Sequence, residues 1–118
     1  MDEAANGLEE TENHSAKTVS FGDKTYMLDQ FGFLDPPEQW DKDFANGMAR
    51  LQGIYEGLTE EHWDFISYIR EKVLTEKTLP LLVMACAENK LPLGKLKSLF
   101  PTGYFRGACR IAGLPFFA

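Results

Sequence analysis

The chain has 118 residues, of which 44% are hydrophobic and 13% aromatic, a composition typical of one folded globular domain. Its formal net charge of −6 argues against a protein that coats nucleic acid in general. The charge is unevenly distributed, because residues 90–118 carry five basic side chains and no acid, whereas residues 18–89 carry thirteen acids and six bases. An electrostatic partner is therefore expected to bind the C-terminal third of the chain.

The sequence has two cysteines, no signal-peptide pattern and no apolar run of about 18 residues. These features predict a soluble cytoplasmic protein with no membrane partner. Residues 1–17 are polar and acidic without hydrophobic periodicity, and we expect a disordered acidic tail there. Residues 18–118 are expected to form a single domain.

Two β-prone runs, residues 18–21 and 24–28, flank Gly22-Asp23 and predict a tight β-hairpin. The rest of the domain is predicted to be helical, which makes the fold class mostly α (α+β). The expected helices cover residues 38–52, a segment that begins at Thr59, and residues 78–89, 95–100 and 102–113.

Apolar side chains recur at helical spacing in three of these segments, and each set predicts a buried face. The sets are Trp40, Phe44, Met48 and Leu51; Trp63, Ile66, Ile69 and Val73; and Leu79, Leu82, Val83 and Cys86. Cys86 is accordingly expected to be a small buried hydrophobe. Thr59 and Thr78 are expected to cap their helices. His62, a single histidine beside carboxylates, is not a metal-ligand set, and no metal site is predicted.

The segment at residues 102–113 contains Cys109, the candidate reactive group of the chain. Thr102 is expected to cap this helix, and Gly113 followed by Leu114-Pro115 is a helix stop. Cys109 lies between two arginines, with Arg106 three residues before it on the same helix face and Arg110 directly after it. Two cations at this i, i+4 spacing repel each other, so an anionic partner is expected to meet them.

Three separated motifs carry a resemblance to the DsrC/TusE family, which comprises the gamma protein of dissimilatory sulfite reductase and related sulfur-relay proteins. They are Gly32-Phe33-Leu34 with a downstream Trp40, Leu58-Thr59-Glu60-Glu61-His62-Trp63-Asp64, and residues 99–103 followed by Gly107-Ala108-Cys109-Arg110-Ile111-Ala112-Gly113-Leu114-Pro115. The resemblance covers about residues 18–115. The motifs occur in the family's order.

The resemblance implies a sulfur-trafficking or sulfite reductase-associated protein that carries sulfur as a persulfide on Cys109. Arg106 and Arg110 would stabilise the thiolate electrostatically. The implied partners are a sulfite reductase, which would itself carry siroheme, or sulfur-relay proteins. The chain would then be a carrier or accessory subunit that binds no cofactor, rather than a stand-alone enzyme.

The sequence departs from the family pattern after Leu114-Pro115. Family members have a penultimate cysteine on a C-terminal arm, whereas this chain reads Phe116-Phe117-Ala118 there. These residues are expected to seal an apolar groove or to dock into a partner. Without the arm cysteine, an intramolecular disulfide with Cys109 would require Cys86 to lie close.

Three alternatives remain open at this stage. Cys109 could be an inert buried cysteine in a helix, and the chain could be a regulatory adaptor that carries no sulfur. The third is a helix-turn-helix-like DNA-binding protein, whose basic side chains would contact phosphates. These side chains are Lys95, Lys97, Arg106 and Arg110.

Overall fold

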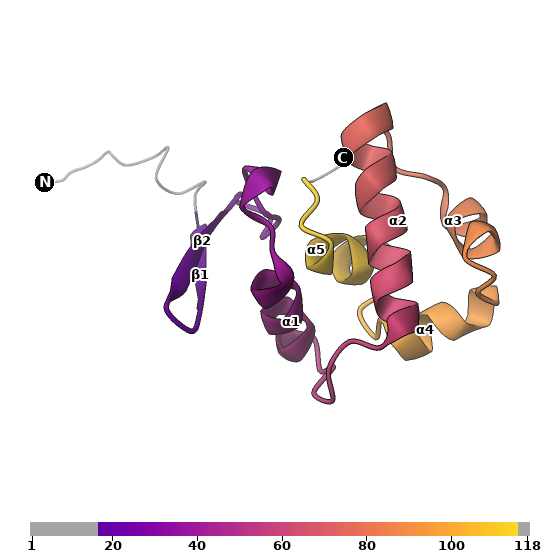
Figure 1. The fold of residues 1–118 in the computed structure, drawn as a ribbon, viewed down its shortest axis with the longest axis horizontal. Coiled ribbons are helices and arrows are strands. Elements are labelled where there is room, and N and C mark those ends of the chain that lie inside the picture. Colours follow the sequence, from indigo (N-terminus) through magenta and orange to yellow (C-terminus); the bar gives the residue numbers. More distant parts are fainter. Residues whose placement is uncertain (1–16, 116–118) are drawn as a thin grey trace, which may run out of the picture.

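The structure, a computed structural model, describes residues 17–115. A two-stranded hairpin lies at one end of the molecule, and five helices form the rest (Figure 1). This arrangement confirms the predicted fold class, mostly α with an N-terminal hairpin. The predicted tail lies outside the described residues except for Lys17, which begins the first strand, and so do Phe116-Phe117-Ala118. No helix of the described residues is long and apolar enough to cross a membrane.

The hairpin pairs β1 (Lys17–Phe21) with β2 (Lys24–Leu28) in antiparallel register, so that Gly22-Asp23 form the predicted turn. The Tyr26 ring is buried and lies 5.1 Å from the Phe44 ring of the first helix, between ring centroids. Phe21 lies so close to Gly47 that a Cβ at this glycine would come within 2.4 Å of the ring. Gly47 therefore weakens its helix locally but allows the hairpin to pack on it.

Helix α1 (Lys42–Leu51) begins four residues later than predicted. A 3-10 turn, η2 (Pro37–Gln39), occupies the expected start, and the Asp41 carboxylate caps α1 by accepting a hydrogen bond from Phe44 N–H (2.8 Å). Trp40 therefore lies outside the helix. The predicted face is wrong at Leu51, which is 66% exposed, because the buried face is completed by Ala45 and Ala49.

Helix α2 (Glu60–Glu76) lies between α5 and α3 and contacts both (Figure 1). Its predicted cap is confirmed, because Thr59 Oγ1 accepts a hydrogen bond from His62 N–H and His62 Nδ1 accepts one from Thr59 N–H. His62 Nε2 donates to the Leu99 carbonyl (2.7 Å), so both ring nitrogens serve the fold. Of the predicted stripe, Trp63 is half-buried, and the buried residues of this face are Phe65, Ile66, Ile69 and Val73.

Helix α3 (Leu82–Glu88) is shorter than the predicted 78–89 segment, and Thr78 does not cap it. Proline disfavours helical backbone at the residue before it, here Leu79, and the chain is still extended at Leu81, directly before the helix. Cys86 is buried as predicted, whereas Val83 is 57% exposed. The short elements η3 (Leu93–Lys95) and α4 (Leu96–Leu99) follow in place of the predicted 95–100 helix.

The last helical segment consists of η4 (Tyr104–Ala108), which has π-helical hydrogen bonding, and α5 (Cys109–Ile111). It begins after Gly103, whose φ of +98° is the left-handed conformation that favours glycine. The prediction that Thr102 caps it is wrong, because the Thr102 hydroxyl donates instead to the Gln52 side-chain carbonyl (3.0 Å).

Candidate functional site

Cys109 lies at the start of α5, which packs against both α1 and α2 (Figure 1), and its side chain is fully buried (0% exposed). Burial raises the pKa of its thiol from 9.0 to about 12. This direction is opposite to the one expected from two neighbouring cations. The thiol is therefore protonated at pH 7, so Cys109 is unreactive in this conformation.

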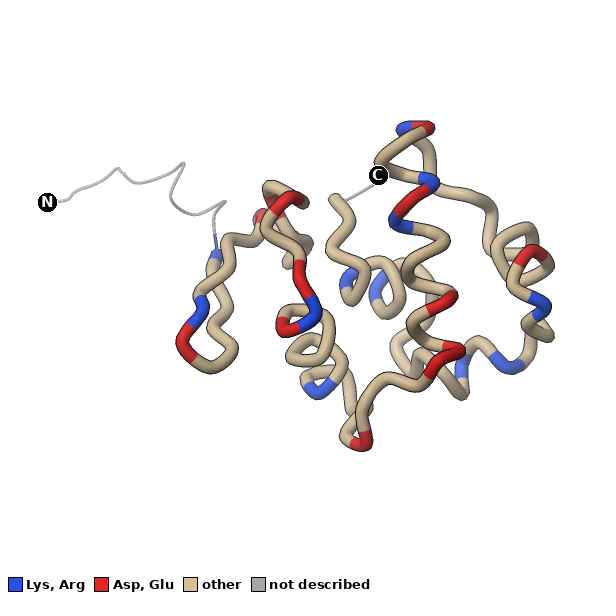
Figure 2. The backbone as a smooth tube through the Cα atoms, in the orientation of Figure 1, with Lys and Arg blue, Asp and Glu red and all other residues tan. Residues whose placement is uncertain are grey.

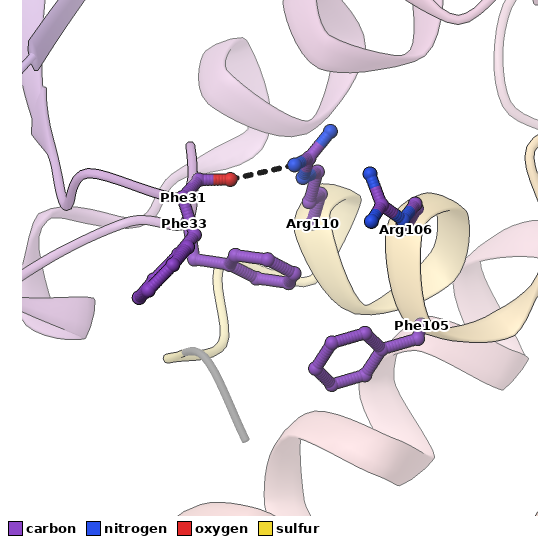
Figure 3. A pocket seen from close by; sticks show the side chains of 5 residues that line it. All are labelled: Phe31, Phe33, Phe105, Arg106 and Arg110. Atoms are coloured by element: carbon purple, nitrogen blue, oxygen red, sulfur yellow. Dashed lines mark hydrogen bonds between the residues drawn. The ribbon is translucent and has the colours of Figure 1, made fainter. Parts of the chain in front are cut away.

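The two arginines do not offset the effect of burial on the thiol, whose pKa shift has burial as its only resolved cause. The Arg110 guanidinium donates through Nη2 to the Phe31 carbonyl (2.6 Å), and its Cζ lies 4.8 Å from the centre of the Phe33 ring. Arg106 is exposed. Both arginines line an open pocket with three phenylalanines, so their charges act at the surface rather than at the sulfur (Figure 3).

Tyr104 links the surroundings of the two cysteines, a feature that the sequence analysis missed. Its hydroxyl donates to the Pro80 carbonyl (2.7 Å), which joins η4 to the segment before α3. Burial raises the Tyr104 pKa, and a negative charge on Cys109 or Cys86 would raise it further, so the hydroxyl lies within electrostatic range of both cysteines. Both cysteines are free thiols, and no disulfide joins them.

The carboxyl end of α5 is fixed by Arg70 and Trp40. Arg70 donates through Nη1 to the Ala112 carbonyl (2.9 Å), and its Cζ lies 4.5 Å from the centre of the Trp40 ring. Trp40 Nε1 donates to the Ile111 carbonyl (2.8 Å). The last carbonyls of a helix lack intrahelical partners, so these two side chains satisfy them and neutralise the negative end of the helix. The sequence assigned Trp40 to a helix face and gave no signal for Arg70.

Gly113 ends this segment as predicted. Its φ is +68°, and a Cβ at this position would lie 2.3 Å from Trp40 Cδ1, so both the backbone and the neighbouring ring require glycine. The Leu114 N–H donates to the Cys109 carbonyl (3.1 Å). This hydrogen bond ties the chain after Gly113 to the helix that holds the cysteine.

The four basic residues of the DNA-binding alternative do not form one free surface. Lys95 Nζ lies 3.3 Å from the Glu61 carboxylate, and Lys97 Nζ donates to the Pro101 carbonyl (3.2 Å). These two lysines lie on or beside α4, whereas both arginines belong to the η4–α5 segment (Figure 2). Among residues 17–115, no group of three histidine, cysteine or acidic side chains could hold a metal ion.

Comparison with known proteins decides the family. The model of the family described as "DsrC like protein" matches residues 20–116. The chain belongs to the DsrC family. Cys109 and its GAC motif lie within the matched region.

Relatives of known name or structure agree with this assignment. The Haemophilus influenzae protein named "Sulfurtransferase TusE homolog" is 38% identical over 95 residues, which cover 74% of this chain and 84% of the relative. The Escherichia coli protein named "Sulfurtransferase TusE" is 35% identical over 102 residues, covering 80% of this chain and 92% of the relative.

The solved structures share the DsrC fold. The oxidized gamma-subunit of dissimilatory sulfite reductase from Archaeoglobus fulgidus has a TM-score of 0.76 and 32% identity, over 86% of this chain and 97% of that one. The NMR structure of Allochromatium vinosum DsrC has a TM-score of 0.70 and 33% identity, over 87% of this chain and 96% of that one.

Proposed function

We propose that this DsrC-family chain is a sulfur-trafficking protein that carries sulfur as a persulfide on Cys109. The observation that carries the proposal is the position of Cys109, which is the cysteine of the GAC motif inside the matched family region. Relatives named as TusE sulfurtransferases support a role in sulfur transfer. The partners that we propose are sulfur-relay proteins or a sulfite reductase, and the cell compartment is the cytoplasm.

The proposed loading step is a thiol exchange that conserves electrons. The Cys109 thiolate attacks the outer sulfur of a donor persulfide, R–S–SH, and forms a new S–S bond. The donor S–S bond breaks, and the donor leaves as its thiolate, R–S⁻. Delivery to an acceptor thiol repeats the exchange in the opposite direction, so neither step needs a cofactor in this chain.

The burial of Cys109 means that this step requires an opened conformation. In the closed structure the thiol is fully covered and its pKa is raised to about 12, so a donor can neither reach nor ionise it. We propose that a partner opens the η4–α5 segment, after which Arg106 and Arg110 stabilise the exposed thiolate. Burial would then protect the persulfide from water and from small thiols between partners.

Intact-mass spectrometry after incubation with a sulfane-sulfur donor and its cognate sulfurtransferase tests the proposal. Wild type and Cys86→Ser are expected to gain the mass of one or more sulfur atoms, and Cys109→Ser is expected to gain none. Circular dichroism of each variant controls for unfolding. Loading of Cys109→Ser equal to wild type would refute the site, and no gain in any variant would favour the adaptor alternative.

A further inference from the structure

The segment that contains Cys109 is buried unequally along its length. At its amino end, residues 101–106 are exposed or half-buried. Toward its carboxyl end, residues 107–114 are buried, apart from the half-buried Arg110. Local opening of a folded protein starts where few apolar side chains are buried and hydrogen bonds are exposed. The amino end is therefore the part of this segment that is expected to open first.

The side-chain contacts at the two ends differ in the same direction. At the carboxyl end, Trp40 Nε1 and Arg70 Nη1 donate to backbone carbonyls over 2.8 and 2.9 Å, and the guanidinium also lies over the indole ring. At the amino end, Gln52 Nε2 donates to both the Arg106 and the Gly107 carbonyls over 3.3 Å. Typical N–H···O hydrogen bonds measure about 2.7–3.2 Å, so the amino end is held by the weaker bonds.

Gln52 joins the amino end of the segment to the end of α1. Besides its bonds to the two carbonyls, its Oε1 accepts a hydrogen bond from the Thr102 hydroxyl (3.0 Å). The Gln52 backbone N–H bonds to the Met48 and Ala49 carbonyls, so the residue is fixed to its helix. A Cβ at Gly107 would lie 2.7 Å from Thr102 Oγ1. Glycine is therefore needed at that position to keep the Thr102 hydroxyl on Gln52.

The chain before the segment provides a hinge. Gly103 has a φ of +98°, and nothing lies within 4 Å of a Cβ added there, so the backbone has room to rotate. The Tyr104 hydroxyl, which donates to the Pro80 carbonyl (2.7 Å), must also separate when this end opens. Water can pair with both groups of that bond, so its net contribution to closure is modest.

We propose that Gln52 is a positioning residue that keeps the segment closed over Cys109. Release of its three hydrogen bonds opens the amino end at Gly103, while Arg70 and Trp40 hold the carboxyl end in place. A donor can attack only an uncovered thiol, so this release sets how often Cys109 can react. The use of the opening for sulfur transfer rests on the proposed function, whereas the opening itself does not.

Alkylation of the native full chain with iodoacetamide tests the role of Gln52. Tryptic peptides 107–110 and 78–90 report the rates at Cys109 and at Cys86 separately, so Cys86 is an internal control. Gln52→Met keeps the length of the side chain but removes its amide. We expect it to raise the Cys109 rate about tenfold, because hydrogen bonds that favour the closed form are lost, and to change the Cys86 rate less than about twofold.

A second pair of variants reaches the same contact from the other side. Gly107→Ala displaces the Thr102 hydroxyl and is expected to raise the Cys109 rate, although alanine favours a helix more than glycine does. Gly94→Ala is the matched control, because nothing lies within 4 Å of the added Cβ, and it should change the rate less than about twofold. An unchanged Cys109 rate in Gln52→Met would overturn the proposal, and so would equal increases at Cys109 and Cys86, which indicate global unfolding.

Sulfur loading separates this inference from the proposed function. With glutathione persulfide as donor and no sulfurtransferase, Gln52→Met should gain sulfur on Cys109 about tenfold faster than wild type. Faster alkylation without any gain of sulfur would support the role of Gln52 and contradict sulfur carriage. An unchanged alkylation rate, together with sulfur loading of wild type by a sulfurtransferase, would refute the role of Gln52 and leave the proposed function intact.

Discussion

Gly113 is the position at which a single added methyl group tests the packing around the cysteine helix most sharply. Gly113→Ala forces alanine into a left-handed conformation, which costs about 1–2 kcal/mol. The new Cβ would also lie 2.3 Å from Trp40 Cδ1 and 3.0 Å from Leu34 Cδ2, and overpacking of this kind costs about 1–3 kcal/mol. The free energy of unfolding should therefore fall by about 2–5 kcal/mol.

Gly22→Ala is a matched control, because Gly22 has nearly the same φ (+66° against +68°) and nothing within 4 Å of the added Cβ. It should cost only the backbone contribution, about 1–2 kcal/mol. With a urea m-value of about 2 kcal/mol/M, the unfolding midpoint should fall by about 1–2.5 M in Gly113→Ala and by about 0.5–1 M in Gly22→Ala. Equal midpoints for the two variants would show that Trp40 does not pack against Gly113 as described.

Three further measurements test other parts of the structure. In a Cys86→Ser background, native Cys109 should react with iodoacetamide at least about 10³-fold more slowly than the same cysteine in urea-unfolded protein, because burial raises the thiol pKa from 9.0 to about 12. Reaction rates within about tenfold of each other would contradict the burial of Cys109. Burial raises the pKa of Asp41, but the hydrogen bonds that its carboxylate accepts outweigh burial and lower the pKa overall. The ionised Asp41 therefore stabilises the fold above about pH 4, and this stabilisation is lost as the pH falls further. Wild type should therefore lose more stability than Asp41→Asn between about pH 5 and pH 3, and parallel pH profiles would exclude this role. Trp40→Phe removes the N–H donor to the Ile111 carbonyl and should destabilise the chain by about 1 kcal/mol or more in urea titrations, whereas unchanged stability would rule out that hydrogen bond.

Local signals in the sequence predicted the parts of the fold that depend on neighbouring residues. The Gly22-Asp23 turn was found because a two-residue connection between alternating strands has few solutions. The start of α2 was found because Thr59 and the acids after it satisfy the first N–H groups of the helix. The end of the last helix was found because Gly113 can adopt a positive φ and Pro115 stops the helix from resuming.

Features that depend on distant residues were predicted wrongly or missed. Trp40 has the correct spacing for a helix face, but its indole N–H bonds to a carbonyl 71 residues away, which no local pattern shows. Thr102 is a plausible cap, yet its hydroxyl bonds to Gln52 across the fold. Helical spacing also placed Val83 inside, because it cannot distinguish a buried face from an apolar surface.

In the candidate site, too, the sequence predicted the local motif but not the features that depend on tertiary packing. The motif around Cys109 was evident in the sequence, but its burial and the direction of its pKa shift follow from tertiary packing. Arg106 and Arg110 were expected to act on the thiol because they are its neighbours along the chain. In the fold they line a pocket with Phe31, which is 79 residues before Arg110 in the sequence. Helical periodicity does not predict a contact between residues so far apart along the chain.

Site mapping of bound sulfur tests the central claim, sulfur transport on Cys109, most directly. After loading and alkylation with a persulfide-reactive reagent, trypsin cleaves at Arg106 and Arg110 and separates the peptide 107–110, which contains Cys109, from the peptide 78–90, which contains Cys86. The account predicts that tandem mass spectrometry finds the additional sulfur on peptide 107–110. Additional sulfur found on peptide 78–90 alone would contradict it.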